Sequence, residues 1–251
     1  MARKESGRKG NILTWTLIFL NVAVFLFVFS APESIMTGLF ERFSLSQGTA
    51  FQLWRWIASM FLHASATHLF FNMIGLYFFG RILEKEIKPQ WFLSIYFASG
   101  FLGGMAFILT STVPVVGASA AIFGLMGAVM LLKPLEKVYV FLFPLPLGIV
   151  AALYIITESF VAYYQPGFGN VAHIAHLGGI ATGALLAFIK NPGKAAKGLL
   201  MLGLLVAVVL VLYPVFGLLA GLGQYILGII DNVVGFFLYG AASLLGFLWR
   251  T

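Results

Sequence analysis

Three short stretches of the sequence carry hydroxyl, imidazole and amide groups that are unusual in so apolar a chain. Ser119 stands among glycines and alanines in the stretch VVGASAAIFGLMGA. His68 and Asn72 lie in FLHASATHLFFNMIGLYFFG, and His176 lies in VAHIAHLGGIATGALLAF. A serine hydroxyl becomes a useful nucleophile when a positioned neutral imidazole takes its proton. Amide and imidazole N–H groups can then stabilise the oxyanion that forms, so the inventory fits acyl transfer.

Composition identifies the solvent in which these groups must work. Of the 251 residues, 61% are hydrophobic and only 9% are charged, and the mean hydropathy is +1.01. These values lie far from those of soluble domains and indicate one polytopic membrane domain in a lipid bilayer. The basic residues that give the net charge of +7 lie between the apolar runs. This position indicates that they orient the chain in the membrane and do not bind nucleic acid. The absence of cysteine excludes disulfides and thiolate metal sites.

Long apolar runs predict an all-α polytopic membrane protein. The predicted helices cover residues 11–30, 57–80, 91–111, 117–133, 143–164, 172–190 and 198–219, and a final apolar stretch covers 222–249. The first run is too long for a signal-peptide core and lacks a cleavage pattern, so it is expected to be retained. The final stretch contains Asp231 and Asn232 and many glycines, so it either spans the membrane or lies at its surface.

The distribution of basic residues predicts a cytoplasmic N-terminus. If the helices alternate in direction, one side of the membrane receives Arg3, Lys4, Arg8, Lys9, Arg81, Lys85, Lys88, Lys133, Lys137, Lys190, Lys194 and Lys197. Before the final stretch, the other side receives only Arg42 and Arg55. Short cytoplasmic loops carry the excess of lysine and arginine. Under this topology the three stretches with polar groups begin their helices at the non-cytoplasmic end.

Small residues predict that the helices of Ser119 and His176 touch. His176, Gly179 and Gly183 follow one stripe of their helix, and Ser119 and Gly127 share a stripe of theirs. Such stripes let membrane helices approach closely. Ser119 and His176 need this approach to come within hydrogen-bonding distance, about 2.6–3.2 Å. Taken alone, Ser119 would be interpreted as one more small packing residue.

The motifs and their order resemble the rhomboid family of intramembrane serine proteases. The resemblance covers roughly residues 12–190. It rests on WRW at 54–56, the His-x4-His-x3-Asn pattern of HASATHLFFNM, the Gly-x3-Glu turn and third helix of GRILEKEIKPQWFLSIYFASG, GAS at 117–119, and AHLGGIATG. It implies a six-helix rhomboid-like protease core at 11–190, preceded by a basic cytoplasmic segment at 1–10. Residues 191–251 would add one or two transmembrane helices.

The resemblance also implies a role for each of several residues. Ser119 would be the nucleophile and His176 the general base, and His68, Asn72 and the Ser119 amide would form the oxyanion hole. The supporting residues would be Gly117 beside that hole, His63 in a structural role, Phe123 packed on the catalytic imidazole, and the Trp-Arg pair Trp54 and Arg55. No metal or other cofactor is implied.

The implied activity is endoproteolysis of transmembrane segments in other membrane proteins, at the non-cytoplasmic side of the bilayer. The short chain with a basic N-terminus is typical of a prokaryotic plasma-membrane protein. The family motif usually reads Gly-x-Ser-Gly, whereas Ala120 follows the serine here. Alanine is well tolerated in the first turn of a helix, so activity is expected to survive. A changed shape of the substrate-binding site is one expected consequence.

Two alternatives stay open. A catalytically inactive rhomboid-like protein that binds membrane proteins would explain Ala120. A transporter would explain Glu158 and Asp231 as intramembrane acids, although the chain contains no convincing internal repeat. His173 has no role in the resemblance and is interpreted as an interfacial histidine.

Overall fold

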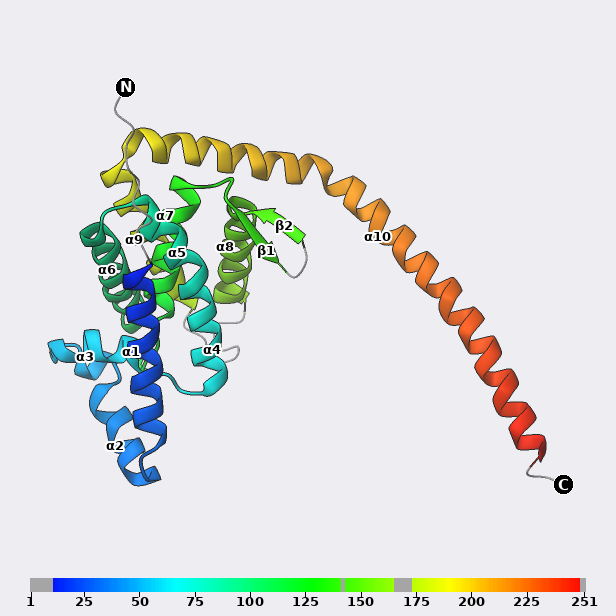
Figure 1. Ribbon diagram of the computed structural model, residues 1–251, viewed down its shortest axis with the longest axis horizontal. Coiled ribbons are helices and arrows are strands. Elements are labelled where there is room, and N and C mark those ends of the chain that lie inside the picture. Colours follow the sequence, from blue (N-terminus) through cyan, green and yellow to red (C-terminus); the bar gives the residue numbers. More distant parts are fainter. Residues whose placement is uncertain (1–10, 141–142, 165–172, 249–251) are drawn as a thin grey trace. The chain divides into compact units, whose positions relative to one another are not determined.

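The computed structural model describes residues 11–140, 143–164 and 173–248, and most of these residues are helical. The chain divides into two units, Met1–Gly203 and Leu204–Thr251. The elements are drawn in Figure 1 and have the following bounds: α1 Ile12–Phe29, α2 Glu33–Phe43, α3 Leu53–Ala58, α4 Ala66–Gly75, α5 Arg81–Glu86, α6 Pro89–Ile108, α7 Ser119–Leu132, β1 Lys137–Val140, β2 Phe143–Pro146, α8 Leu147–Tyr164, α9 His173–Lys190 and α10 Pro192–Leu248.

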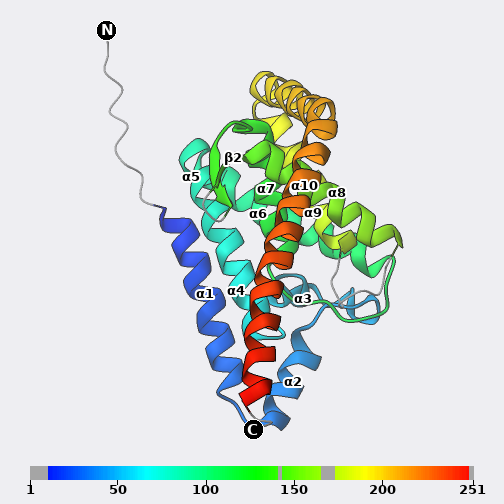
Figure 2. The ribbon, with the colours of Figure 1, turned by 90° about the vertical axis from the view of Figure 1, so that its right-hand side faces the viewer.

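The chain is a mostly helical membrane protein with several candidate spans. Within the described residues, α1, α6 and α9 are long and apolar enough to cross a bilayer. A fourth candidate is the bent pair Leu53–Phe61 and Ala66–Glu86, whose two parts meet at 91°. Figure 2 shows α4, a part of that pair, beside α1.

The bent pair corrects the helix that the sequence predicted at 57–80. The straight part begins at Ala66, passes through a π-helical turn at Leu76–Gly80, and ends at Glu86. It begins there because Ser65 caps it, its Oγ accepting the His68 N–H at 3.1 Å. His63 therefore lies in the connection before the helix.

The all-α prediction is wrong between α7 and α8, where the chain forms a two-stranded antiparallel hairpin. Val138 pairs with Leu145, and Val140 with Phe143. The helix predicted from residue 143 starts only at Leu147. Pro144 and the proline at 146 explain the delay, because the residue before a proline is pushed towards extended backbone and proline cannot donate a helical hydrogen bond.

A single helix replaces the two C-terminal stretches that the sequence separated at about residue 220. α10 continues through Gly221 and Gly223 without a break. Glycine lowers helix stability by about 1 kcal/mol but keeps its backbone donor, so it does not end a helix by itself. One or two C-terminal transmembrane helices remain a prediction.

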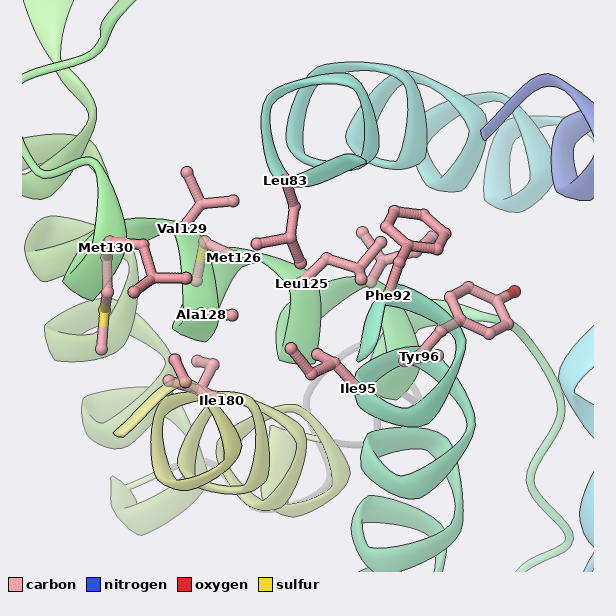
Figure 3. Close-up of a cluster of buried hydrophobic side chains, with 14 of the residues drawn as sticks. Leu83, Phe92, Ile95, Tyr96, Leu125, Met126, Ala128, Val129, Met130 and Ile180 are labelled. Carbon is pink, nitrogen blue, oxygen red and sulfur yellow. The ribbon is translucent and has the colours of Figure 1, made fainter. Parts of the chain in front are cut away.

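Helix α7 lies in the middle of the first unit and is almost entirely buried. Of its 14 residues, all but Ser119 and Phe123 are buried. Figure 3 shows the surrounding side chains, with Leu125, Met126 and Val129 of α7 among Leu83 of α5, Phe92 and Ile95 of α6 and Ile180 of α9. The helix that begins with Ser119 is thus held from several sides.

Glycines bring the backbones of α7 and α9 into contact, as their spacing predicted. A Cβ atom built on Gly183 would lie 1.8 Å from the carbonyl oxygen of Gly124. A Cβ atom on Gly127 would lie 2.3 Å from the carbonyl oxygen of Ile180. No larger residue fits at these positions without separating the two helices, so the glycines determine the distance across which a serine and a histidine could meet.

Charged side chains connect the first turns of α10 to the end of this core where α5 and α7 finish. Glu86 forms ion pairs with Lys133, at 3.2 Å, and with Lys194. A Cβ atom on Gly198 would lie 1.8 Å from the carbonyl oxygen of Leu131. The segment that follows α9 therefore packs directly against the end of α7.

Glu84 joins α5 to the start of α1. Its carboxyl oxygens accept the backbone N–H groups of Leu13 and Thr14, both at 2.9 Å, and the Thr14 hydroxyl at 2.7 Å. These N–H groups belong to the first turn of α1, where no helical partner exists. Gly80 lets the two segments approach, since a Cβ atom there would lie 2.9 Å from Thr14 Oγ1.

Replacing Glu84 by alanine is expected to lower the free energy of unfolding by about 2–3 kcal/mol, because it leaves buried donors without partners. Unfolding by SDS in detergent micelles would measure this change. Glu136→Ala, which removes an exposed carboxyl group, is the matched control and is expected to change stability by under about 0.5 kcal/mol. Equal effects of the two substitutions would contradict the capping role.

Candidate active site

The structure brings Ser119 and His176 together. His176 Nε2 lies 2.9 Å from Ser119 Oγ, although the two residues are 57 positions apart in the chain. Ser119 is the first residue of α7, and His176 lies in the first turn of α9 with only 6% of its surface exposed. The distance is that of a hydrogen bond, so the imidazole is within reach of the hydroxyl proton.

Gly117 shapes the turn that leads into Ser119. Its φ angle is +116°, a backbone conformation that residues other than glycine rarely adopt. Its N–H donates to the carbonyl oxygen of Ser59 at 2.8 Å. A Cβ atom there would lie 2.7 Å from the His68 ring. Both the backbone angle and the crowding require glycine, and the Ser59 contact was not foreseen from the sequence.

His68 and Asn72 lie on α4 beside this turn. The Cβ position of Gly117 is 2.8 Å from His68 Nε2 and 3.7 Å from Asn72 Nδ2. Asn72 is buried, and its Nδ2 donates to the carbonyl oxygen of His68 at 3.1 Å. An amide nitrogen carries two hydrogens, so this bond leaves Asn72 a second one to donate. Two side chains with N–H groups therefore border the loop that precedes the serine.

The first turn of α7 adds backbone donors. The residue before the helix is Ala118, whose side chain cannot cap the helix end. The N–H groups of a first turn have no partner within their own helix. The N–H of Ser119 is one of these groups, so it is available for an oxyanion at the serine.

The ring of Phe123 packs against the imidazole of His176. The Phe123 ring centroid lies 4.3 Å from that of His176, and 4.7 Å from that of Tyr154 on α8. The ring planes are tilted by 44° and 33°, and ring pairs at such distances attract one another beyond their buried area. Phe123 thus contacts the histidine as the sequence suggested, while the contact with Tyr154 could not be read from the sequence.

Two further histidines lie nearby. His63 is 1% exposed, its Nδ1 lies 3.4 Å from the Phe61 carbonyl oxygen, and its ring is 5.1 Å from that of His68. His173 is also buried, and its ring stands at 83° to that of His176 with centroids 6.2 Å apart. The four histidines of the chain therefore form two neighbouring pairs, one that contacts Gly117 through His68 and one that contacts Ser119 through His176.

The WRW stretch lies outside this cluster and organises the connection between α1 and α4. The Arg55 guanidinium is buried and donates to the carbonyl oxygens of Glu41, at 2.6 Å, and Ser44, at 2.9 Å. Trp56 stacks on Phe101 of α6 with centroids 4.2 Å apart. Trp54, by contrast, is 55% exposed. The sequence analysis named Trp54 and Arg55, whereas the contact with α6 is made by Trp56.

The sequence also singled out two acidic residues, Asp231 and Glu158. Asp231 lies in α10, in the second unit, and is exposed. The side chain of Glu158 lies outside the described residues. In the part of the chain that the structure describes, no three histidine, cysteine, aspartate or glutamate side chains are arranged to hold a metal ion.

Comparison with known proteins identifies the family. The Rhomboid domain model matches residues 50–192. The chain is 30% identical over 188 residues to rhomboid protease GlpG of Pectobacterium atrosepticum, and 29% identical over 209 residues to rhomboid protease GluP of Bacillus subtilis. It is 30% identical over 190 residues to the mitochondrial RHOMBOID-like protein 12 of Arabidopsis thaliana.

These matches cover 74%, 77% and 67% of this chain, and 66%, 39% and 55% of the respective relatives. The chain therefore belongs to the rhomboid family of membrane proteins, to which relatives named rhomboid proteases belong. It spans less than two thirds of the length of these relatives.

Proposed function

We propose that this protein is an intramembrane serine endopeptidase that uses Ser119 as its nucleophile and His176 as its general base. The observation that carries the proposal is the 2.9 Å distance between Ser119 Oγ and His176 Nε2. Family membership and the names of the relatives support it. The glycine contacts between α7 and α9 support it further, because they hold the two helices at the distance that the pair needs.

In the proposed reaction, Ser119 Oγ attacks the carbonyl carbon of a peptide bond and passes its proton to His176 Nε2. The tetrahedral intermediate collapses when the C–N bond breaks, and the imidazolium returns the proton to the leaving nitrogen. The acyl group then rests on Ser119 as an ester. A water molecule, deprotonated by His176, hydrolyses this ester, which releases the new carboxyl end and restores the serine.

The oxyanion of the intermediate would be stabilised by three donors. They are the His68 ring, the free hydrogen of the Asn72 amide, and the backbone N–H of Ser119. The crowding of His68 and Asn72 around Gly117 supports this assignment, since it holds both side chains beside the residue two positions before the nucleophile. In an apolar site, such fixed donors act more strongly than in water.

The proposed substrates are transmembrane segments of other proteins, cut near the non-cytoplasmic surface. With Lys133 at the cytoplasmic surface, the 14 residues of α7 rise only about 21 Å at 1.5 Å per residue. The hydrocarbon core is about 30 Å thick, so Ser119 would lie below the opposite surface. A substrate must unwind there to expose a carbonyl, which favours segments with glycine, proline or small polar residues.

We further propose the topology and organisation that follow from the charge distribution. Residues 1–10 form a cytoplasmic segment, 11–190 form the protease core, and 191–251 add one or two spans. The protein resides in the plasma membrane of a prokaryote, with its site open to the non-cytoplasmic side. The bacterial relatives support this location.

Reconstitution in liposomes tests the proposal. Purified protein is incubated with transmembrane segments that carry a fluorophore and differ in glycine, proline and small polar content. The expected result is cleavage within or next to the membrane segment by wild type, and none above background by Ser119→Ala.

The matched control is Ser99→Ala, which alters a serine that is buried in α6 and makes no side-chain hydrogen bond to any residue that the structure describes. This variant is expected to cleave like wild type. Cleavage that survives in Ser119→Ala would exclude the serine mechanism. No cleavage of any substrate by well-folded wild type would favour an inactive, client-binding member of the family.

A further inference from the structure

Gly103 of α6 lies where three helices meet beside the proposed catalytic pair. A Cβ atom built on Gly103 would lie 2.5 Å from the carbonyl oxygen of Ala175, 2.8 Å from the Ala120 methyl carbon and 3.2 Å from the Gly179 nitrogen. Ala120 directly follows Ser119 on α7, and Ala175 directly precedes His176 on α9. One glycine therefore contacts the neighbours of both residues.

These contacts also show which way the Ala120 methyl group points. Ala120 is only 7% exposed, and its Cβ faces Gly103 across the α6–α7 contact. On the other side, the Ala120 carbonyl oxygen lies 2.1 Å from the position that a Cβ on Gly179 would take. The Ala120 methyl group, which distinguishes this chain from the usual Gly-x-Ser-Gly motif, thus packs against α6 of the same protein.

We propose that Gly103 and Ala120 form a size-matched pair that sets the position of Ser119 relative to His176. Gly103 is a positioning residue, because it touches the residues next to the catalytic pair and leaves substrate untouched. The residue at 120 packs against α6, so it affects the alignment of the serine more than the choice of substrate. This inference rests on the proposed protease function.

The backbone contacts explain why alanine at 103 is harmful. The added methyl group would meet a carbonyl oxygen of α9, which is part of a helix and cannot rotate away. The first turn of α9, which carries His176, must then move outwards. A displacement of about 1 Å in a catalytic group can cost roughly 10²-fold in rate. Packed interiors transmit such shifts because they contain few voids.

Four proteins test the pair: wild type, Gly103→Ala, Ala120→Gly and the double variant. The first measurement is the rate at which a small fluorophosphonate labels Ser119, which reports the alignment of serine and histidine without a peptide substrate. Gly103→Ala is expected to label roughly 10²-fold more slowly. The double variant is expected to regain about tenfold, because Ala120→Gly removes one of the two closest contacts and residues in contact couple strongly.

The second measurement is cleavage of the fluorescent transmembrane segments. Ala120→Gly is expected to leave KM and the cleaved bond unchanged, and Gly103→Ala is expected to lower kcat with little change in KM. Gly104→Ala is the control for the α6 substitution, since the nearest atoms to its added methyl group would be side-chain atoms of Leu45, at 3.2 Å, and Trp56, at 3.9 Å, and no backbone atom. It is expected to label and cleave like wild type.

Two kinetic results would overturn the proposal. One is a double variant that labels no faster than Gly103→Ala. The other is an Ala120→Gly variant with a changed KM or cleaved bond and an unchanged labelling rate, which would mean that the methyl group faces substrate. The thermal unfolding midpoints of the four proteins in detergent provide a readout that does not depend on activity.

These midpoints separate failure of the pair from failure of the proposed function. If wild type neither labels nor cleaves, the protease proposal fails. The packing claim still predicts that Ala120→Gly raises the midpoint of Gly103→Ala and lowers that of wild type. If the midpoint changes of the two single variants simply add up in the double variant, the two residues are not coupled and the pair is rejected. This test holds without any enzymatic activity, and it also holds if Gly103→Ala folds too poorly for its kinetics to be measured.

Discussion

Replacing His176 by alanine is expected to reduce kcat/KM for a transmembrane substrate by at least about 10⁴-fold. The Ser119 hydroxyl then has no base, and a serine at its ordinary pKa is a poor nucleophile. The loss is expected mainly in kcat, because the imidazole acts on the reacting atoms. Substrate binding depends on contacts along the rest of the substrate's transmembrane segment. Combining His176→Ala with Ser119→Ala is expected to add little, since the two residues act as one unit.

Cleavage rates in liposomes, at several substrate concentrations, measure this effect. The matched control is His173→Ala, which removes a second buried imidazole one turn away on the same helix. That variant is expected to keep its rate within about threefold of wild type. A His176→Ala protein that cleaves within tenfold of wild type, or a His173→Ala protein with the larger loss, would contradict the assignment of the base.

Replacing Asn72 by alanine is expected to reduce kcat by about 10²–10³-fold, with a much smaller change in KM. The amide donates one hydrogen to the His68 carbonyl oxygen at 3.1 Å, and the other is proposed to meet the oxyanion. The oxyanion exists only in the intermediate and the transition states around it. Loss of a donor to it therefore slows the chemical step without weakening ground-state binding.

The chain offers a closely matched control for Asn72. Asn21 of α1 is also buried and donates from Nδ2 to the carbonyl oxygen four residues earlier, that of Leu17, at 2.8 Å. Asn21→Ala removes the same kind of helical hydrogen bond at a distance from the site, so it is expected to lower stability and leave kcat unchanged. Equal losses of kcat in the two variants would remove Asn72 from the oxyanion hole.

The sequence predicted best those helices whose bounds depend only on the length and hydrophobicity of an apolar run. The apolar runs at 91–111 and 172–190 correspond to α6 at Pro89–Ile108 and α9 at His173–Lys190. Hydropathy failed where local backbone chemistry intervened. It missed the bend before Ala66, which follows from capping by Ser65, and the hairpin before Leu147, which follows from two prolines. It also broke α10 at glycines that the helix tolerates.

For the site, residue types and helical spacing selected side chains that the structure places together. Ser119, His176 and Phe123 are in contact, and Gly117 lies against His68. Their catalytic roles remain predictions. The contacts that the sequence did not reveal involve backbone atoms or positions with no chemical signature. The Ser59 carbonyl and Gly103 are of this kind, because their importance depends on which distant segment packs against them.

Covalent labelling followed by mass spectrometry tests the central claim most directly, because it requires no knowledge of the natural substrate. Wild type, Ser119→Ala and His176→Ala are treated with a fluorophosphonate in liposomes, and the modified peptide is sequenced by fragmentation. The account predicts one adduct per wild-type chain, attached to Ser119, and no adduct above background in either variant. An adduct on a different residue, or labelling of Ser119 that persists unchanged in His176→Ala, would contradict it.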